Sequence, residues 1–231
     1  MYLSRLILNP RTRRVQRELA NPYELHRALM AAFPPNLPQG ERVLYRVDVD
    51  ARSGVPIVLL QSYSQPDWAW LGDPRASGYL QQAPEAKTFY LTFVAGQRLT
   101  FRLRANPTVK RWLPRDKDNL DSEKKPMRLP ITSDENLRSW LDRKGTSGGF
   151  RVLTAVVHQE GTLVVRQRRR PATSERDEDR SARSRTLTFH AVLFEGILQV
   201  TDPDVLWRTV QQGIGSAKGF GFGLLSLAPP R

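Results

Sequence analysis

The sequence predicts an α+β fold made of two domains of similar plan, residues 1–115 and 116–231. A chain of 231 residues suits one large domain or two small ones, and an apolar fraction of 39% is enough for packed cores. In both halves, short segments in which apolar and polar residues alternate, as in strands, are mixed with a few segments of helical periodicity. A stretch without periodicity, residues 105–131, separates these halves and is expected to be an inter-domain loop.

The first half begins with the pattern strand, helix, strand, strand. The elements expected in chain order are a strand at residues 2–8, a basic loop at 9–17, a helix at 22–33 and strands at 42–49 and 56–63. The helix ends before Pro34-Pro35, and turn-forming residues at 50–54 join the two strands as a hairpin.

The remainder of this half is less regular. Residues 64–88 are rich in Pro and Gly and are expected to be irregular cover that carries Trp68 and Trp70. A late strand at residues 98–104 then places Leu99, Phe101 and Leu103 on one face and Arg102 and Arg104 on the other. This order of elements is compatible with a ferredoxin-like sandwich.

The second half again predicts helices and strands around one sheet. The elements expected are a helix at residues 133–145, a hairpin of 150–158 with 162–168, paired strands at 186–194 and 197–200, a helix at 205–212 and a closing strand at 224–227. Gly161 and Gly196 mark the two expected turns. Residues 171–185 are charged and rich in Ser and Arg, which predicts a disordered loop tip.

The start of the first predicted helix carries a Tyr–His pair. Asn21 suits the N-cap, Pro22 the first helical position, and Glu24 the third position of a capping box. Tyr23 and His26 share a face that lies off the apolar stripe of the helix, at the positive end of its dipole. Histidine suits proton transfer near neutral pH, so the pair fits chemistry on an anion such as phosphate, although surface residues at a helix start would look the same.

The charge balance indicates a polyanionic partner. Lys and Arg number 36 against 23 Asp and Glu, which gives a formal net charge of +13, and arginine dominates the cations. The flat guanidinium fork suits phosphate, so nucleic acid is the leading candidate.

Several classes of protein are excluded or disfavoured. The absence of cysteine excludes disulfides, thiolate metal sites and a cysteine nucleophile, and three scattered histidines make a metal site improbable. No apolar run approaches membrane-spanning length and no signal peptide is recognisable, so we expect a cytoplasmic protein without a membrane partner.

A glycine-rich loop near the end of the chain is the second candidate site. Residues 213–223 include Gly213, Gly215, Gly219 and Gly221 together with Lys218, so backbone amides and a cation could cradle a phosphodiester. The loop has neither dinucleotide-binding nor Walker A spacing. A tight connection packed against its own sheet explains the glycines equally well.

Arginines also recur at alternate positions of two predicted strands. One row is Arg102 and Arg104, and the other is Arg166, Arg168 and Arg170. Alternation places each row on one sheet face, where it can follow phosphates, and the strong positive charge favours binding over a merely solvated face. His158 and His190 lie in strands with alternating apolar neighbours and are expected to be partly buried or edge histidines rather than catalysts.

Five segments, in order along nearly the whole chain, resemble the CRISPR-associated endoribonuclease CasE family of type I-E systems. They are Leu8-Asn9-Pro10, residues 19–27, residues 101–107, residues 191–196 and the closing segment 213–229. The charged segment at residues 171–185 departs from the family pattern. The resemblance implies two tandem ferredoxin-like domains, of the RRM-like RAMP type, with the glycine-rich loop near the cleft between them.

The resemblance also implies an activity. Family members cleave CRISPR repeat RNA at the base of its stem-loop without a metal or other cofactor, by attack of a 2′-OH that leaves a 2′,3′-cyclic phosphate and a 5′-OH. The family's catalytic positions map onto Tyr23 and His26. The residues expected to contact RNA are Arg27, Arg102, Arg104, Arg166, Arg168 and Lys218.

Partners follow from the same resemblance. Cleaved RNA would stay bound while the protein serves as a subunit of Cascade, and cleavage would need no DNA contact. A non-catalytic RNA-binding scaffold of the same fold, or a basic structural protein of a ribonucleoprotein, are the alternatives.

Overall fold

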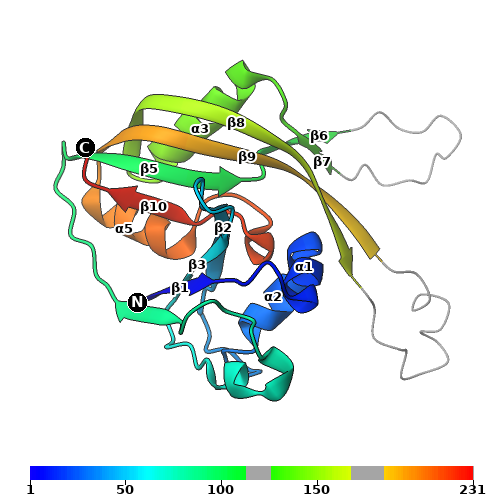
Figure 1. Ribbon diagram of the computed structural model, residues 1–231. Helices are drawn as coiled ribbons and strands as arrows, with labels where there is room; N and C mark the ends of the chain where they lie inside the picture. The colour runs from blue at the N-terminus through cyan, green and yellow to red at the C-terminus, as the bar shows by residue number, and fades with distance from the viewer. Residues whose placement is uncertain (113–125, 168–184, 231) are drawn as a thin grey trace, which may run out of the picture.

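The computed structural model describes residues 1–112, 126–167 and 185–230 (Figure 1). Its first sheet is antiparallel throughout, with the order β2-β3-β1-β4. The strands are β1 (Tyr2–Ile7), β2 (Leu44–Val49), β3 (Pro56–Ser62) and β4 (Glu85–Thr88). Helices α1 (Arg13–Ala20) and α2 (Pro22–Met30) lie between β1 and β2 in the chain. The 3₁₀ turns η1 (Ala69–Gly72) and η2 (Pro74–Ala76) lie between β3 and β4.

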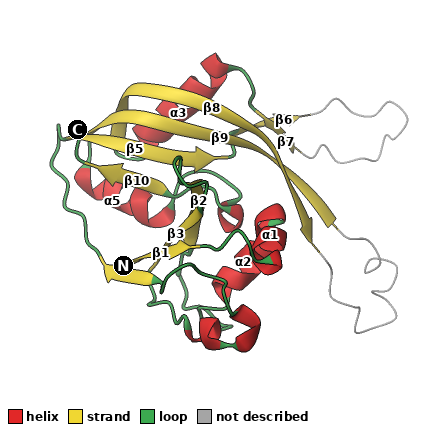
Figure 2. Ribbon diagram, in the orientation of Figure 1, coloured by secondary structure: helices red, strands yellow, loops and turns green. Residues whose placement is uncertain are grey.

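The second sheet is also antiparallel, with the order β10-β5-β9-β8. Its strands are β5 (Arg98–Ala105), β8 (Phe150–Gln167), β9 (Arg185–Val200) and β10 (Leu225–Ala228). Helix α3 (Asp134–Ser147) lies between β5 and β8 in the chain, and helix α5 (Pro203–Gln212) lies between β9 and β10 (Figure 2). When the four strands of each sheet are numbered 1 to 4 along the chain, both sheets have the strand order 4-1-3-2. This is the strand order of a ferredoxin-like fold.

Each sheet has its own hydrophobic core. Leu6, Val58 and Leu60 of the first sheet pack with Leu25 and Leu29 of α2. The core of the second sheet joins one face of β5, as predicted, to α3 and α5; its members include Leu99, Phe101, Leu103, Leu137, Trp140 and Leu206. The predicted α+β class is confirmed.

The strand predicted at residues 98–104 is confirmed, but its assignment to the sheet of the first half is wrong. This strand, β5, pairs with β9 and β10. The late strand of the first sheet is instead β4, which lies in the segment predicted as irregular. Strand pairing is non-local, so the alternation in β5 identified its buried face but not its partners.

The two hairpins predicted around Gly161 and Gly196 are also wrong. β8 and β9 are each continuous and pair with one another along their length. Gly161, with φ of +93°, lies at a register shift, and a Cβ at Gly196 would stand 2.0 Å from the carbonyl oxygen of Thr154. These glycines permit a bulge and a close backbone approach inside strands, rather than turns.

Smaller differences concern the connecting segments. α1 occupies part of the predicted basic loop at residues 9–17. Its sequence is dominated by arginines, so the short apolar face that includes Val15 was not recognised as helical. The predicted inter-domain loop contains the two-stranded ribbon of β6 (Thr108–Trp112) and β7 (Pro126–Pro130). Most of the charged segment at residues 171–185 lies outside the described residues.

Candidate active site

Helix α2 begins at a cap that also joins the two sheets. The Asn21 Oδ1 accepts hydrogen bonds from the backbone N–H of Tyr23 at 3.4 Å and of Arg166 at 3.2 Å. Its Nδ2 donates to the carbonyl oxygen of Arg166 at 3.0 Å. The predicted N-cap is therefore confirmed, and it fixes the start of α2 against β8.

The predicted capping box is not formed. The Glu24 carboxylate pairs with Arg27 at 3.3 Å, and the Asn21 N–H donates to the carbonyl oxygen of Glu18 at 3.3 Å. α1 ends directly before Asn21, so its last turn already supplies the acceptor that Glu24 would have offered.

His26 faces the glycine-rich loop. Its ring lies 6.3 Å from that of Phe220 in an edge-on arrangement, and a Cβ at Gly219 would stand 3.6 Å from the His26 Cε1. Burial lowers the pKa of His26 below its usual value of 6.5, so the ring is mainly neutral at pH 7. Two motifs from opposite ends of the chain thus meet at this histidine.

Tyr45 on β2 holds this junction together. Its hydroxyl lies 3.3 Å from the carbonyl oxygen of Gly219 and 3.4 Å from that of Pro22, and it donates to these acceptors. The side chain is buried, and desolvation raises the pKa of the phenol, so it remains a donor at neutral pH. Tyr45 was missed from the sequence because only tertiary structure brings it to both α2 and the loop.

The glycine-rich loop is closed on itself and on the second sheet. The Ile214 N–H donates to the carbonyl oxygen of Gly223 at 2.9 Å, and the Gly223 N–H donates to that of Arg104 at 2.8 Å. Gly213 has φ of +71°, and a Cβ there would stand 2.8 Å from the Gly223 carbonyl oxygen. Gly215 and Gly221 also have positive φ. The loop therefore packs against its own sheet and also reaches His26.

Lys218 folds back on the end of α5. Its Nζ donates to the carbonyl oxygen of Gln212 at 2.7 Å. Burial, with smaller contributions from Arg42 and Lys144, lowers the pKa of Lys218.

Of the arginines predicted to contact RNA, Arg102 and Arg104 are both paired with carboxylates. Arg104 pairs with Glu160 at 2.5 Å and covers the ring of Phe222 at 4.8 Å. It lines a depression of about 410 Å³ together with Tyr45, Pro22, Leu25, Phe220 and Gly221. Arg104 thus lies near the junction at His26.

Arg102 belongs to a separate charged cluster between the sheets. It pairs with Glu195 at 2.6 Å and lies 3.6 Å from Asp48, which also binds the buried Arg46 at 2.8 Å. Arg166 lies on β8, where its backbone bonds Asn21, and its side chain is exposed. Arg168 and Arg170 lie outside the described residues.

The other two histidines lie in strands of the second sheet. His158 is exposed, with its Nε2 4.0 Å from Glu195. His190 is half-buried; its N–H donates to the Asn106 Oδ1 at 3.0 Å, and its Nε2 lies 3.1 Å from the Gln159 Oε1.

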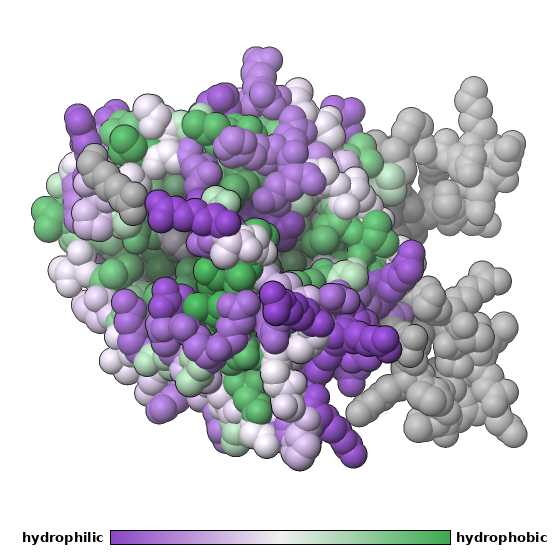
Figure 3. All heavy atoms as spheres, in the orientation of Figure 1, coloured by the Kyte–Doolittle hydropathy of each residue, from purple (hydrophilic) through white to green (hydrophobic). Residues whose placement is uncertain are grey.

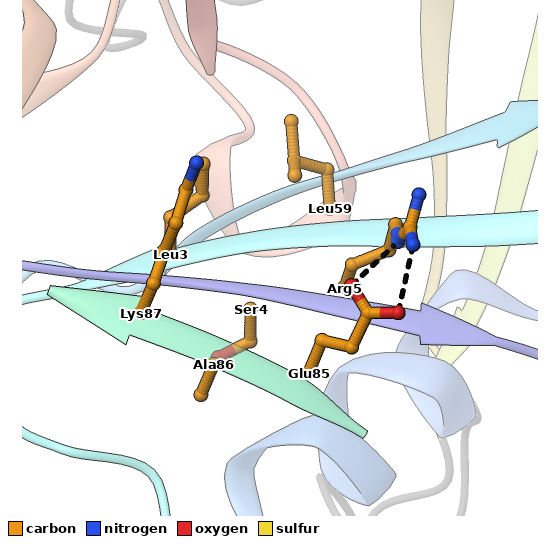
Figure 4. Close-up of a pocket in the computed structure, with 7 residues that line it drawn as sticks. All are labelled: Leu3, Ser4, Arg5, Leu59, Glu85, Ala86 and Lys87. Carbon is orange, nitrogen blue, oxygen red and sulfur yellow. Dashed lines mark hydrogen bonds and ion pairs between the residues drawn. The ribbon is translucent and has the colours of Figure 1, made fainter. Parts of the chain in front are cut away.

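A second depression, of about 440 Å³, lies on β1 and β4 and contains none of the predicted site residues (Figure 4). Its charged groups Arg5 and Glu85 pair with each other at 2.7 Å. Among the described residues, no three His, Asp or Glu side chains are grouped to hold a metal ion. No helix within the described ranges is long and apolar enough to cross a membrane.

The family model for CRISPR associated protein matches residues 1–229. The chain belongs to this family. It is 38% identical to the CRISPR-associated endoribonuclease Cse3 of Thermus thermophilus, over 99% of this chain and 100% of that protein. It is 34% identical to the Cascade subunit CasE of Escherichia coli, with the same coverage. The resemblance found in the sequence is confirmed.

Solved structures of this CRISPR-associated family share the fold. Cse3 bound to a 19-nucleotide RNA superposes with a TM-score of 0.76 at 37% identity, covering 99% of this chain and 100% of that one. Cas6e from Escherichia coli gives a TM-score of 0.67 at 28% identity, with full coverage of both chains.

Proposed function

We propose that this protein is a metal-independent endoribonuclease that cleaves CRISPR repeat stem-loops in precursor RNA and retains the product as a subunit of Cascade. The observation that carries the proposal is the position of His26, a neutral histidine held between the start of α2 and the glycine-rich loop. The names and RNA-bound structures of the relatives support RNA as the substrate.

The chemistry requires positioning and proton transfer. The 2′-oxygen attacks the adjacent phosphorus, the bond from phosphorus to the 5′-oxygen breaks, and the products carry a 2′,3′-cyclic phosphate and a 5′-OH. A neutral His26 accepts a proton from the 2′-OH, and its protonated form gives one to the leaving 5′-oxygen; either role fits this side chain. Tyr23, half-buried on the same turn of α2, would position or stabilise the phosphate.

Cleavage of a repeat hairpin in the presence of EDTA tests the proposal. We expect His26→Ala to lower the single-turnover rate by about 100-fold or more, the usual contribution of a general acid or base, while hairpin binding persists. His158→Ala, which alters an exposed histidine on β8, is the matched control and should cleave at the parental rate. Binding of the hairpin without a cut by the parent would instead favour the non-catalytic scaffold, and indifference to RNA structure the basic structural protein.

A further inference from the structure

A basic groove lies between α1, α2 and the turn η2. Its volume is about 550 Å³, and we call it the α1–α2 groove. Its lining residues are Arg14, Arg17, Glu18, Glu24, Arg27, Ala28, Ala31 and Arg75. Strongly hydrophilic side chains cover this part of the surface, over α1 at the right of Figure 3. Of these residues, only Arg27 was expected from the sequence to contact RNA.

Arg14 is fixed in place before any ligand binds. Its Nε donates to Glu18 at 2.9 Å, and its guanidinium covers the rings of Trp70 at 4.8 Å and Tyr79 at 5.1 Å. Glu18 is itself 4% exposed and accepts a hydrogen bond from the Tyr79 hydroxyl at 2.6 Å. A guanidinium held in this way binds an anion with little further loss of side-chain entropy.

The groove carries a net positive charge, and some of its arginines are not paired with a carboxylate of the described residues. Four arginines face two glutamates, and both glutamates are engaged, Glu18 with Arg14 and Glu24 with Arg27. Arg17 and Arg75 are exposed and form no salt bridge with any residue that the structure describes. These two arginines are therefore available to a ligand that brings negative charge.

We propose that the α1–α2 groove binds the phosphodiester backbone of single-stranded RNA that flanks the cleaved hairpin, an inference that rests on the proposed function. Arg27 lines the groove and directly follows His26 on α2, about 100° around the helix, so the groove adjoins the proposed catalytic side chain. Arginine forks match phosphate oxygens in pairs.

The test compares a minimal hairpin, cut off just beyond the scissile bond, with the same hairpin carrying single-stranded extensions upstream or downstream. An extension should raise the affinity of the parent protein. The double variant Arg17→Ala/Arg75→Ala should lose this gain while it binds and cleaves the minimal hairpin as the parent does. Removing two phosphate contacts should flatten the salt dependence for extended RNA by about 1.4 in slope, or about sevenfold in affinity between roughly 50 and 200 mM salt.

Arg52→Ala/Arg98→Ala removes two exposed arginines that do not line the groove and should keep the full gain. Thermal unfolding of all three proteins verifies that the changes leave the fold intact. An extension gain that survives in Arg17→Ala/Arg75→Ala, or that is missing in an active parent, overturns the groove proposal alone. A parent that fails to cleave the minimal hairpin overturns the proposed function, and the groove proposal with it.

Discussion

Replacing Tyr45 by phenylalanine removes one oxygen atom from the junction that holds His26. The ring fills the same space, so the core of the first sheet should stay packed. Only the bonds to the carbonyl oxygens of Gly219 and Pro22 are lost. The change therefore loosens the glycine-rich loop against α2 without altering any side chain proposed to contact RNA.

The size of the effect follows from the geometry. A phenol has one proton and shares it between two acceptors here, and distances of 3.3 and 3.4 Å are long for an O–H···O bond. The net loss should be about 0.5–1 kcal/mol, at the lower end for a neutral hydrogen bond. If the bond positions His26 during the reaction, the single-turnover rate should fall about two- to fivefold.

The assay is single-turnover cleavage of the minimal hairpin, with binding and thermal unfolding measured in parallel. Tyr79→Phe is the matched control, since that buried hydroxyl lies in the same core but bonds Glu18 of α1, at 2.6 Å, and not the loop. The control should lose more stability, about 1.5–3 kcal/mol for a bond to a charged group, yet keep the parental rate. Equal rates for Tyr45→Phe and the parent would show that the hydroxyl does not position the histidine.

Three further predictions concern the fold around the site. Because burial lowers the pKa of His26, the free energy of unfolding should fall as pH drops from 6.5 through that lowered value. Urea unfolding of His26→Gln should show a smaller loss of stability over the same pH range. An equal loss in the variant and the parent would contradict the burial of His26. Gly196→Ala places a Cβ 2.0 Å from the Thr154 carbonyl oxygen. The urea midpoint should therefore fall, and the free energy of unfolding should drop by about 1–3 kcal/mol or more. Asn21→Ala should cost about 1–2 kcal/mol and speed hydrogen exchange at the Arg166 amide, whereas unchanged exchange would rule out the link to β8.

The local features of the fold could be predicted from the sequence. Alternation placed Leu99, Phe101 and Leu103 on the buried face of β5, and Asn21-Pro22 marked the first turn of α2. Both depend on neighbours in the chain. The sheet to which β5 belongs depends on residues about a hundred positions away, and its alternation is equally compatible with either sheet.

The structural role of each glycine could not be predicted from the sequence, for a physical reason. A turn, a bulge and a close backbone contact all require the missing Cβ, and the sequence does not distinguish them. Gly161 and Gly196 were expected to end strands, but they lie within two long ones. The same ambiguity at the glycine-rich loop is resolved by its packing, since Gly213 is pressed against Gly223 while Gly219 faces His26.

Several individual residues of the candidate site were predicted from the sequence, but the contacts that bring them together were not. Tyr23 and His26 were singled out on α2 and Gly219 in the loop, whereas Tyr45, Glu160 and the α1–α2 groove offered no local signal. Each of these gains its meaning from a partner in another element, such as Arg104 for Glu160. Arg102 and Arg104 were grouped by their alternation, yet only Arg104 lines the depression near His26.

The site depends on both sheets at once. His26 and Tyr45 come from the first unit, and Gly219 with the Arg166 backbone comes from the second. A side chain larger than glycine at position 219 would extend toward His26, and loss of the Asn21 bonds would free the start of α2 from β8. The chemistry assigned to His26 therefore requires that the two units dock correctly, and substitutions at their contacts should reduce cleavage even where each unit remains folded.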